Sequence, residues 1–209
     1  MGKLLHWILA FSGSALLVIA ASTSALAQIG NPGAHDHYSA EIEPHLVVQW
    51  NDQPWWDDDG IGLGLRASIP VLEDGPVRTI NNSLAIGFGL DWAHFDDACW
   101  GPGPRPRPTL EDDCSADDFW LPVVAQWNFF FSELISAFPE LGLAIQHTRW
   151  DGDWCGRGRE LYRCTDGDYS DTDVELVLWL GVRFHLAESV AITLRLGTPS
   201  LLLGVSFFL

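Results

Sequence analysis

Residues 174–186 read VELVLWLGVRFHL, and two kinds of side chain alternate along them. One set of alternate positions is wholly apolar: Val174, Leu176, Leu178, Leu180, Val182, Phe184 and Leu186. The positions between them include the charged residues Glu175 and Arg183, together with Trp179 and Gly181. Alternation with a period of two is typical of a β-strand whose two faces meet different surroundings. The stretch therefore predicts a strand with one uniformly apolar face.

The same alternation recurs along the rest of the chain. It predicts about eight strands, over residues 43–51, 61–72, 83–95, 119–131, 141–151, 174–187, 189–198 and 200–209. Most of these segments have about ten residues or more, whereas a strand of a soluble protein usually has about five or six. Strands that cross a membrane at a tilt need about 9–11 residues. We therefore expect an all-β protein, a closed antiparallel up-and-down transmembrane β-barrel of about eight strands, with its long loops on the extracellular side.

The less apolar faces of these strands are a poor match for water. They carry small residues and a few charges, and the chain after residue 27 has no lysine. A membrane barrel points such residues into its lumen, whereas a soluble lipocalin-like barrel, the alternative, points them outward. We expect a packed polar lumen in which arginines neutralise acids. The expected lumen charge network is Arg66, Asp91, Glu175, Arg183 and Arg195.

The connections between the predicted strands differ in length according to their order. The first, third and fifth, over 52–60, 96–118 and 152–173, hold most of the 28 acidic residues and all four cysteines. In an up-and-down barrel these connections emerge at the same end, and outer-membrane barrels have longer loops at their external end. Most tryptophans fall near that end, at the level where aromatic girdles are expected.

The start of the chain predicts export. Residues 1–27 contain one positive charge, an apolar run and the triplet Ala25-Leu26-Ala27, as in a cleaved signal peptide; the alternative is an N-terminal membrane helix. We expect a flexible segment over 28–41 and the barrel over 42–209. The formal net charge of −17 argues against binding nucleic acid, whose phosphates need a positive surface.

The four cysteines are Cys99, Cys114, Cys155 and Cys164. In an exported chain the default expectation is disulfide bonds. Four cysteines allow three pairings, of which the simplest joins sequence neighbours, Cys99 to Cys114 and Cys155 to Cys164. A zinc site is the rival interpretation, but the spacings typical of zinc ligands are missing.

The signal, the alternating strands, the unequal loops and the last strand together resemble the small eight-stranded outer-membrane β-barrels of Gram-negative bacteria. The last strand carries alternating apolar residues, Leu203, Val205, Phe207 and Leu209. The resemblance implies that these four residues are the signal read by the barrel-assembly machinery. It also implies a location in the outer membrane, although it concerns architecture and transfers no specific activity.

We therefore expect an outer-membrane protein of the structural or interaction type, with no catalytic or metal site and no cofactor. Its expected partners are outer-membrane lipid and lipopolysaccharide, with bridging divalent cations as one route, and an external ligand that the sequence does not name. Two alternatives stay open. One is a narrow channel, and the other is an acyl hydrolase acting on outer-leaflet lipid, for which His94 and His147 are the candidate bases.

Overall fold

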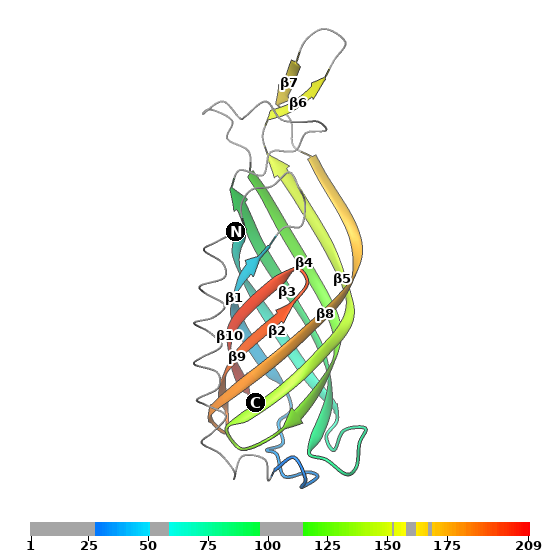
Figure 1. The fold of residues 1–209 in the computed structure, drawn as a ribbon, viewed down its shortest axis with the longest axis vertical. Coiled ribbons are helices and arrows are strands. Elements are labelled where there is room, and N and C mark those ends of the chain that lie inside the picture. The colour runs from blue at the N-terminus through cyan, green and yellow to red at the C-terminus, as the bar shows by residue number, and fades with distance from the viewer. Residues whose placement is uncertain (1–27, 51–58, 97–114, 152, 158–161, 167–168) are drawn as a thin grey trace, which may run out of the picture.

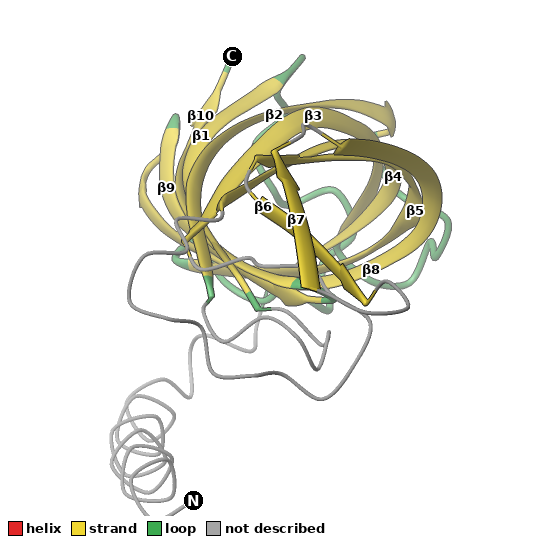
Figure 2. Ribbon diagram, turned by 90° about the horizontal axis from the view of Figure 1, so that it is seen from above, coloured by secondary structure: helices red, strands yellow, loops and turns green. Residues whose placement is uncertain are grey.

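The computed structural model describes residues 28–50, 59–96, 115–151, 153–157, 162–166 and 169–209. Eight antiparallel strands form a closed barrel in the order β1-β10-β9-β8-β5-β4-β3-β2 (Figures 1 and 2). Their bounds are β1 Glu41–Gln49, β2 Gly60–Leu72, β3 Asn82–Asp96, β4 Ser115–Phe130, β5 Ile135–Asp151, β8 Tyr169–Ala187, β9 Val190–Gly197 and β10 Ser200–Phe208. A separate two-stranded sheet is made of β6 Asp153–Arg157 and β7 Tyr162–Asp166. The expected closed antiparallel barrel of eight strands is confirmed, while the extracellular position of its long loops stays a prediction.

Four neighbouring strands are longer than the sequence pattern predicts. β3, β4, β5 and β8 have 15 to 19 residues and rise above β1, β9 and β10 (Figure 1). The sequence pattern leaves residues 132–140 as a connection between two predicted strands, and this prediction is wrong. Ile135 already pairs with Phe184, and the ladder runs on to Trp150 and Tyr169. The pair Pro139-Glu140 looks like a turn in sequence, yet both residues lie within β5.

The outer wall of the barrel is apolar and the inner wall is mixed. On β8, Leu176, Leu178 and Leu180 are 71%, 54% and 64% exposed, whereas Val177 and Trp179 between them are 1% exposed. Large apolar side chains are exposed in the same way on every strand of the barrel. An apolar surface of this extent is incompatible with water and fits the hydrocarbon of a bilayer. Among the described residues no helix is long and apolar enough to cross a membrane.

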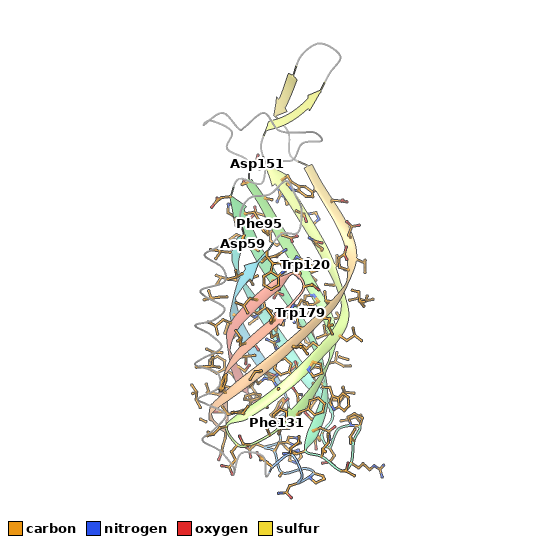
Figure 3. The ribbon with its side chains drawn as sticks, in the orientation of Figure 1. Asp59, Phe95, Trp120, Phe131, Asp151 and Trp179 are labelled. Atoms are coloured by element: carbon orange, nitrogen blue, oxygen red, sulfur yellow. The ribbon has the colours of Figure 1, made fainter. Side chains whose placement is uncertain are left out.

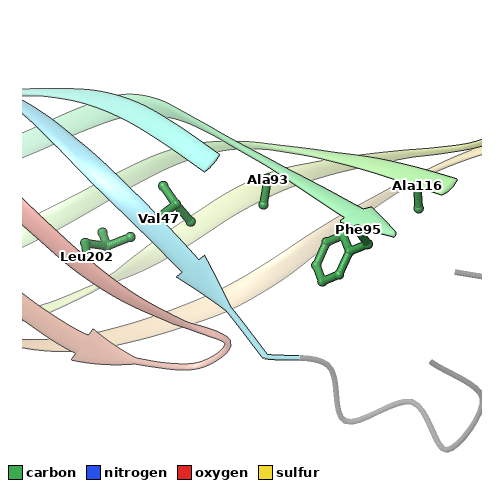
Figure 4. Packing of buried hydrophobic residues seen from close by; sticks show 5 residues of the cluster. All are labelled: Val47, Ala93, Phe95, Ala116 and Leu202. Atoms are coloured by element: carbon green, nitrogen blue, oxygen red, sulfur yellow. The ribbon is translucent and has the colours of Figure 1, made fainter. Parts of the chain in front are cut away.

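Apolar side chains also fill part of the lumen. One buried cluster consists of Val47, Ala93, Phe95, Ala116 and Leu202 (Figure 4). Its Phe95 lies toward the end that carries β6 and β7 (Figure 3). A second cluster consists of Trp120, Val124, Ala144, Val177 and Trp179; its two tryptophans lie at mid-height of the barrel (Figure 3). The barrel is thus packed with side chains, as expected of one with eight strands.

The last strand closes the barrel against the first. β10 pairs with β1 from Glu41 opposite Phe208 to Gln49 opposite Ser200. This closure leaves no free edge along β1, so its backbone groups are paired within the sheet as a bilayer requires. The alternation within β10 sends Leu203, Val205 and Phe207 outward and buries Leu202 and Ser206.

The segment before β1 packs across the opposite end from β6 and β7, although the sequence predicts a flexible segment there. The buried ring of His35 stacks on Phe130, with ring centroids 4.1 Å apart, and its Nδ1 lies 2.6 Å from Asn81 Oδ1. The ring of Tyr38 meets Phe208 edge-on, at 5.0 Å. Burial raises the pKa of Tyr38 to about 12, even though the charge of Arg183 acts to lower it.

The pKa of Tyr38 predicts a loss of stability in alkali. The unfolded chain releases the phenolic proton near its ordinary pKa of about 10, while the folded protein keeps it. Stability is therefore fully present below about pH 10 and is lost as pH rises through about 12. Ultraviolet titration of the phenols should show a late component that is missing in Tyr38→Phe. A late component that survives in Tyr38→Phe would contradict this assignment.

The apolar exterior predicts a position-specific penalty for charge. Replacing Leu180 by Arg puts a guanidinium on the lipid face of β8 and should lower the free energy of unfolding by about 2–4 kcal/mol. The matched variant Leu180→Phe stays apolar and should change it little. The measurement is denaturant unfolding in lipid vesicles. Equal stability of the two variants would show that this face does not contact hydrocarbon.

Candidate functional site

Part of the lumen is lined by charged side chains that strand alternation turns inward. On β1 the residues Glu41, Glu43 and His45 are buried, while Ile42 and Pro44 between them are exposed. Neighbouring strands add Arg66, Asp91, Glu140, Arg183 and Arg195, all at most 4% exposed. Charges taken out of water must be paired to be tolerated, so their contacts decide whether this barrel is stable.

Six of these residues form a closed ring of alternating acids and bases, which we call the lumen ring: His45, Asp91, Arg66, Glu140, Arg195 and Glu43. His45 Nε2 lies 2.8 Å from Asp91 Oδ1. Asp91 Oδ2 accepts from Arg66 Nη2 at 2.8 Å, and Arg66 Nη1 donates to Glu140 Oε2 at 3.1 Å. The ring therefore joins β1, β3, β2 and β5 through side chains alone.

The second half of the lumen ring returns to its starting point. Arg195 Nε on β9 donates to Glu140 Oε1 at 3.2 Å, and Arg195 Nη1 donates to Glu43 Oε1. That oxygen lies 3.8 Å from His45 Nδ1, which closes the ring. Ser206 on β10 donates to the other oxygen of Glu43 at 3.0 Å. Five strands hold the ring, and a sixth supports it.

A separate ion pair lies beside the lumen ring. Arg183 Nε and Nη2 donate to the two carboxylate oxygens of Glu41 at 2.9 and 2.7 Å. This two-point contact is the strongest geometry available to these groups. Ser68 donates to Glu41, and Arg183 Nη1 donates to Asn128 Oδ1, at 2.9 Å each.

Aromatic rings pack against the three guanidinium groups. The guanidinium carbon of Arg66 lies 4.3 Å from the centroid of Trp179, and that of Arg183 lies 3.9 Å from the centroid of Phe138. Arg195 approaches Phe138 from 5.0 Å. Gly181 makes room for Phe138, because a Cβ there would clash with the ring. Cation–π attraction is strongest where water is excluded, as it is here.

Little space is left between these side chains. The void bounded by Glu41, Glu43, Arg66, Gln126 and Arg195 has a volume of about 10 Å³. A single water molecule needs about that much. At this level the lumen is therefore a packed polar core.

A second polar centre lies nearer the end with the long connections. The buried carboxylate of Asp118 accepts hydrogen bonds from Gln49 Nε2 at 2.5 Å, Trp120 Nε1 at 2.7 Å and Thr148 Oγ1 at 2.9 Å. Gln146 Nε2 adds contacts at 2.9 and 3.1 Å. Neutral donors thus stabilise this charge in place of a cation.

The structure brings together four of the five residues predicted for the lumen network. Arg66 pairs with Asp91, and Arg183 and Arg195 lie in the same cluster. Glu175 does not join them: it is exposed on β8, where it lies opposite Ala144. The arginines use Glu41, Glu43 and Glu140 instead, and all three were missed.

Of the missed acids, only those of β1 could have been predicted from the alternation of the sequence. The first strand was predicted from residue 43, which left Glu41 outside it, although Glu41, Glu43 and His45 alternate as inward residues should. Glu140 was hidden by the connection wrongly predicted over 132–140.

The candidate bases of an enzyme lie on the outer face of the wall. His94 Nδ1 lies 2.9 Å from Asp117 Oδ1, which also accepts from Trp92 Nε1. His147 Nδ1 lies 2.8 Å from Thr172 Oγ1. Within the described part of the chain no hydrogen bond joins these two pairs into a nucleophile, base and acid. The described residues also contain no group of three or more His, Cys, Asp or Glu side chains that could hold a metal ion.

Two of the four cysteines lie in the described strands. Cys155 on β6 lies directly opposite Cys164 on β7 in the register of the small sheet. Cys99 and Cys114 lie outside the described residues, as does the predicted signal peptide over 1–27. Of the predicted assembly signal, Leu203, Val205 and Phe207 share the outward face of β10 and Leu209 follows it, also exposed.

Comparison with known proteins supports the fold and nothing finer. No protein-family model and no curated protein matches the chain. Among solved structures, Neisserial surface protein A is 12% identical with a TM-score of 0.51, over 82% of this chain and 97% of the other. The attachment invasion locus protein Ail of Yersinia pestis is 13% identical with a TM-score of 0.50, over 82% and 99%. The chain thus has the fold of the small outer-membrane β-barrels, and its apolar exterior fits a barrel that spans a bilayer.

Proposed function

We propose that the protein is a non-enzymatic barrel of the Gram-negative outer membrane, of the structural or interaction type. In this proposal its lumen is closed, and its acidic, disulfide-braced loops face outward. The observation that carries the proposal is the lumen ring, which fills the barrel with paired charges and leaves a void of only about 10 Å³. The external loops are then the part of the barrel that binds other molecules.

The lengths of the connections support the orientation. At the end that carries β6 and β7, the four connections span residues 50–59, 97–114, 152–168 and 198–199. At the other end the three connections span residues 73–81, 131–134 and 188–189, so the two longest are both at the end with β6 and β7. Outer-membrane barrels have short periplasmic turns and longer external loops. The end with β6 and β7 is therefore the external one in this proposal.

Lipid and the assembly machinery are the partners we propose for the wall. Lipopolysaccharide would meet the outer rim near His94, Asp117 and His147, where divalent cations could bridge its phosphates to carboxylates. The outward row Leu203, Val205, Phe207 and Leu209 would be read during assembly. In this proposal the external loops bind the external ligand.

Epitope tags test the orientation. A tag inserted between β6 and β7, within residues 158–161, should bind antibody on intact cells. The matched tag within residues 73–81, between β2 and β3, should bind only after the outer membrane is permeabilised. The reverse pattern would overturn the orientation, and tags that both fractionate with soluble periplasmic protein would overturn the membrane assignment.

The register of β6 and β7 predicts the pairing of two cysteines. Cys155 lies opposite Cys164 in that register, and we propose that a disulfide bond joins them. Non-reducing peptide mapping by mass spectrometry should find these two cysteines in one cross-linked fragment, with Cys99 joined to Cys114 in another. A fragment joining Cys155 to Cys99 or Cys114 would refute this pairing.

The isolated pair Glu41–Arg183 predicts a non-additive response to mutation. Arg183→Met leaves the Glu41 carboxylate buried without its partner and should lower the free energy of unfolding by about 3–5 kcal/mol. The double variant Glu41→Met with Arg183→Met should recover most of that loss, because a buried ion pair is often replaceable by apolar residues. Denaturant unfolding of the wild type and the three variants measures the coupling. Strictly additive losses would show that the two side chains do not act as a pair.

A further inference from the structure

A hollow of about 670 Å³ lies at the end of the barrel opposite β6 and β7. It is bounded by the segment before β1, the β4–β5 connection over residues 131–134, the β8–β9 connection over residues 188–189 and the end of β10. Phe131, which Figure 3 labels, marks this end of the barrel. No residue of the lumen ring lines the hollow, so it is a separate feature of the fold. A volume of this size is typical of a site for a small organic ligand.

Aromatic rings form part of the lining of this hollow. The ring of Tyr38 meets Phe208 edge-on at 5.0 Å, and His185 stacks on Phe208 with ring centroids 5.5 Å apart. These three side chains are half-buried, so part of each ring remains open to a ligand. Aromatic rings attract positive charge and pack well against apolar stems. The lining therefore favours a cation that carries methylene groups.

Three carboxylates line the same hollow. Asp36, Glu133 and Glu188 come from three different segments, and none of them forms an ion pair within the described part of the chain. The lining, as far as the structure describes it, contains no lysine or arginine. Its three histidines contact partners outside the hollow: His35 with Asn81, His37 with Glu73 and His185 with Ser136. The carboxylates are thus available to a positively charged ligand.

The arrangement suits an elongated cation better than a metal ion or a lipid headgroup. The carboxylates do not converge, since the described residues contain no group of three or more His, Cys, Asp or Glu side chains that could hold a metal ion. A phospholipid carries a phosphate beside its ammonium group, and the described lining has no guanidinium or ammonium group to meet that phosphate.

One buried oxygen of the lining also calls for a donor. Gln28 Nε2 donates to the backbone oxygen of Ala34 at 2.9 Å, whereas Gln28 Oε1 is buried and accepts no hydrogen bond from any described residue. A buried acceptor of this kind is normally paired. An N–H group of a ligand in the hollow would satisfy it.

We propose that the hollow binds a linear polyamine. Its spaced ammonium groups pair with Asp36, Glu133 and Glu188, while its methylene stem lies on the rings of Tyr38 and Phe208. This goes beyond the proposed function, which assigns the binding of other molecules to the loops at the opposite end. In the proposed orientation the hollow faces the periplasm, and the binding itself does not depend on that orientation.

Calorimetric titration of spermidine into the full chain in phosphatidylcholine nanodiscs tests the proposal. Spermidine should bind saturably, and Mg²⁺ at the same ionic strength should not displace it. Glu133→Gln and Glu188→Gln should each weaken binding by up to about fivefold, as expected of exposed ion pairs, and together they should weaken it further. Asp74→Asn is the matched control, because it removes an exposed carboxylate at the same end that does not line the hollow. No binding, displacement by Mg²⁺, or equal affinities of all these variants would overturn the proposal.

Nuclear Overhauser contacts locate the bound spermidine. Its methylene protons should give contacts to the ring protons of Tyr38, with Tyr38→Leu to assign the signal, and a complex without these contacts would contradict the site. Exchanging half of the phosphatidylcholine for phosphatidylethanolamine should leave the affinity for spermidine unchanged. Loss of spermidine binding in that mixture would assign the hollow to a lipid headgroup and overturn the polyamine. The different migration of boiled and unboiled samples on a gel shows that each variant is folded.

Discussion

The structure depends on one constraint: every charge inside the barrel must find its partner inside the barrel. The outer wall is apolar on every strand, so a lumen side chain has no access to water through it. The lumen ring meets this constraint by alternating acids and bases drawn from β1, β2, β3, β5 and β9. These contacts also tie together strands that are not neighbours in the sheet, such as β2 with β5. The charges thereby fix the cross-section of the barrel, which backbone pairing alone leaves adjustable.

The same constraint explains where the small and aromatic residues lie. Glycines on the inner face give space to bulky neighbours: Gly181 to Phe138 and Gly64 to His45. The rings of Trp179 and Phe138 pack against guanidinium groups whose N–H groups donate to carboxylates. At the periplasmic end of the proposed orientation, the segment before β1 packs His35 on Phe130 and Tyr38 on Phe208. The segment before β1 thus packs against the barrel at this end.

Sequence reasoning recovers the barrel because alternation is a local signal. The run from Val174 to Leu186 is enough to predict which side chains face lipid, and the structure agrees. It recovers the arginines of the lumen because a charge on an otherwise apolar strand is conspicuous. It fails for Glu140, which follows Pro139 and therefore looks like a turn residue. It also fails for Glu175, because the alternation places it on the inner face of β8 but does not show that β8 extends beyond the packed part of the lumen at this residue. The partners of an arginine depend on the tilt and stagger of strands far apart in sequence, and alternation carries no information about either.

The proposed interaction role follows from a lumen through which no solute passes. If the ring closes the barrel, only the external loops, the lipid-facing wall and the hollow at the other end can meet other molecules. Conductance across a planar lipid bilayer containing the purified wild-type protein tests this closure most directly. The account predicts no current steps above the bare bilayer at neutral pH, because paired side chains fill the cross-section at the ring. Regular, reproducible steps from the folded protein would show a continuous aqueous path and would contradict the account.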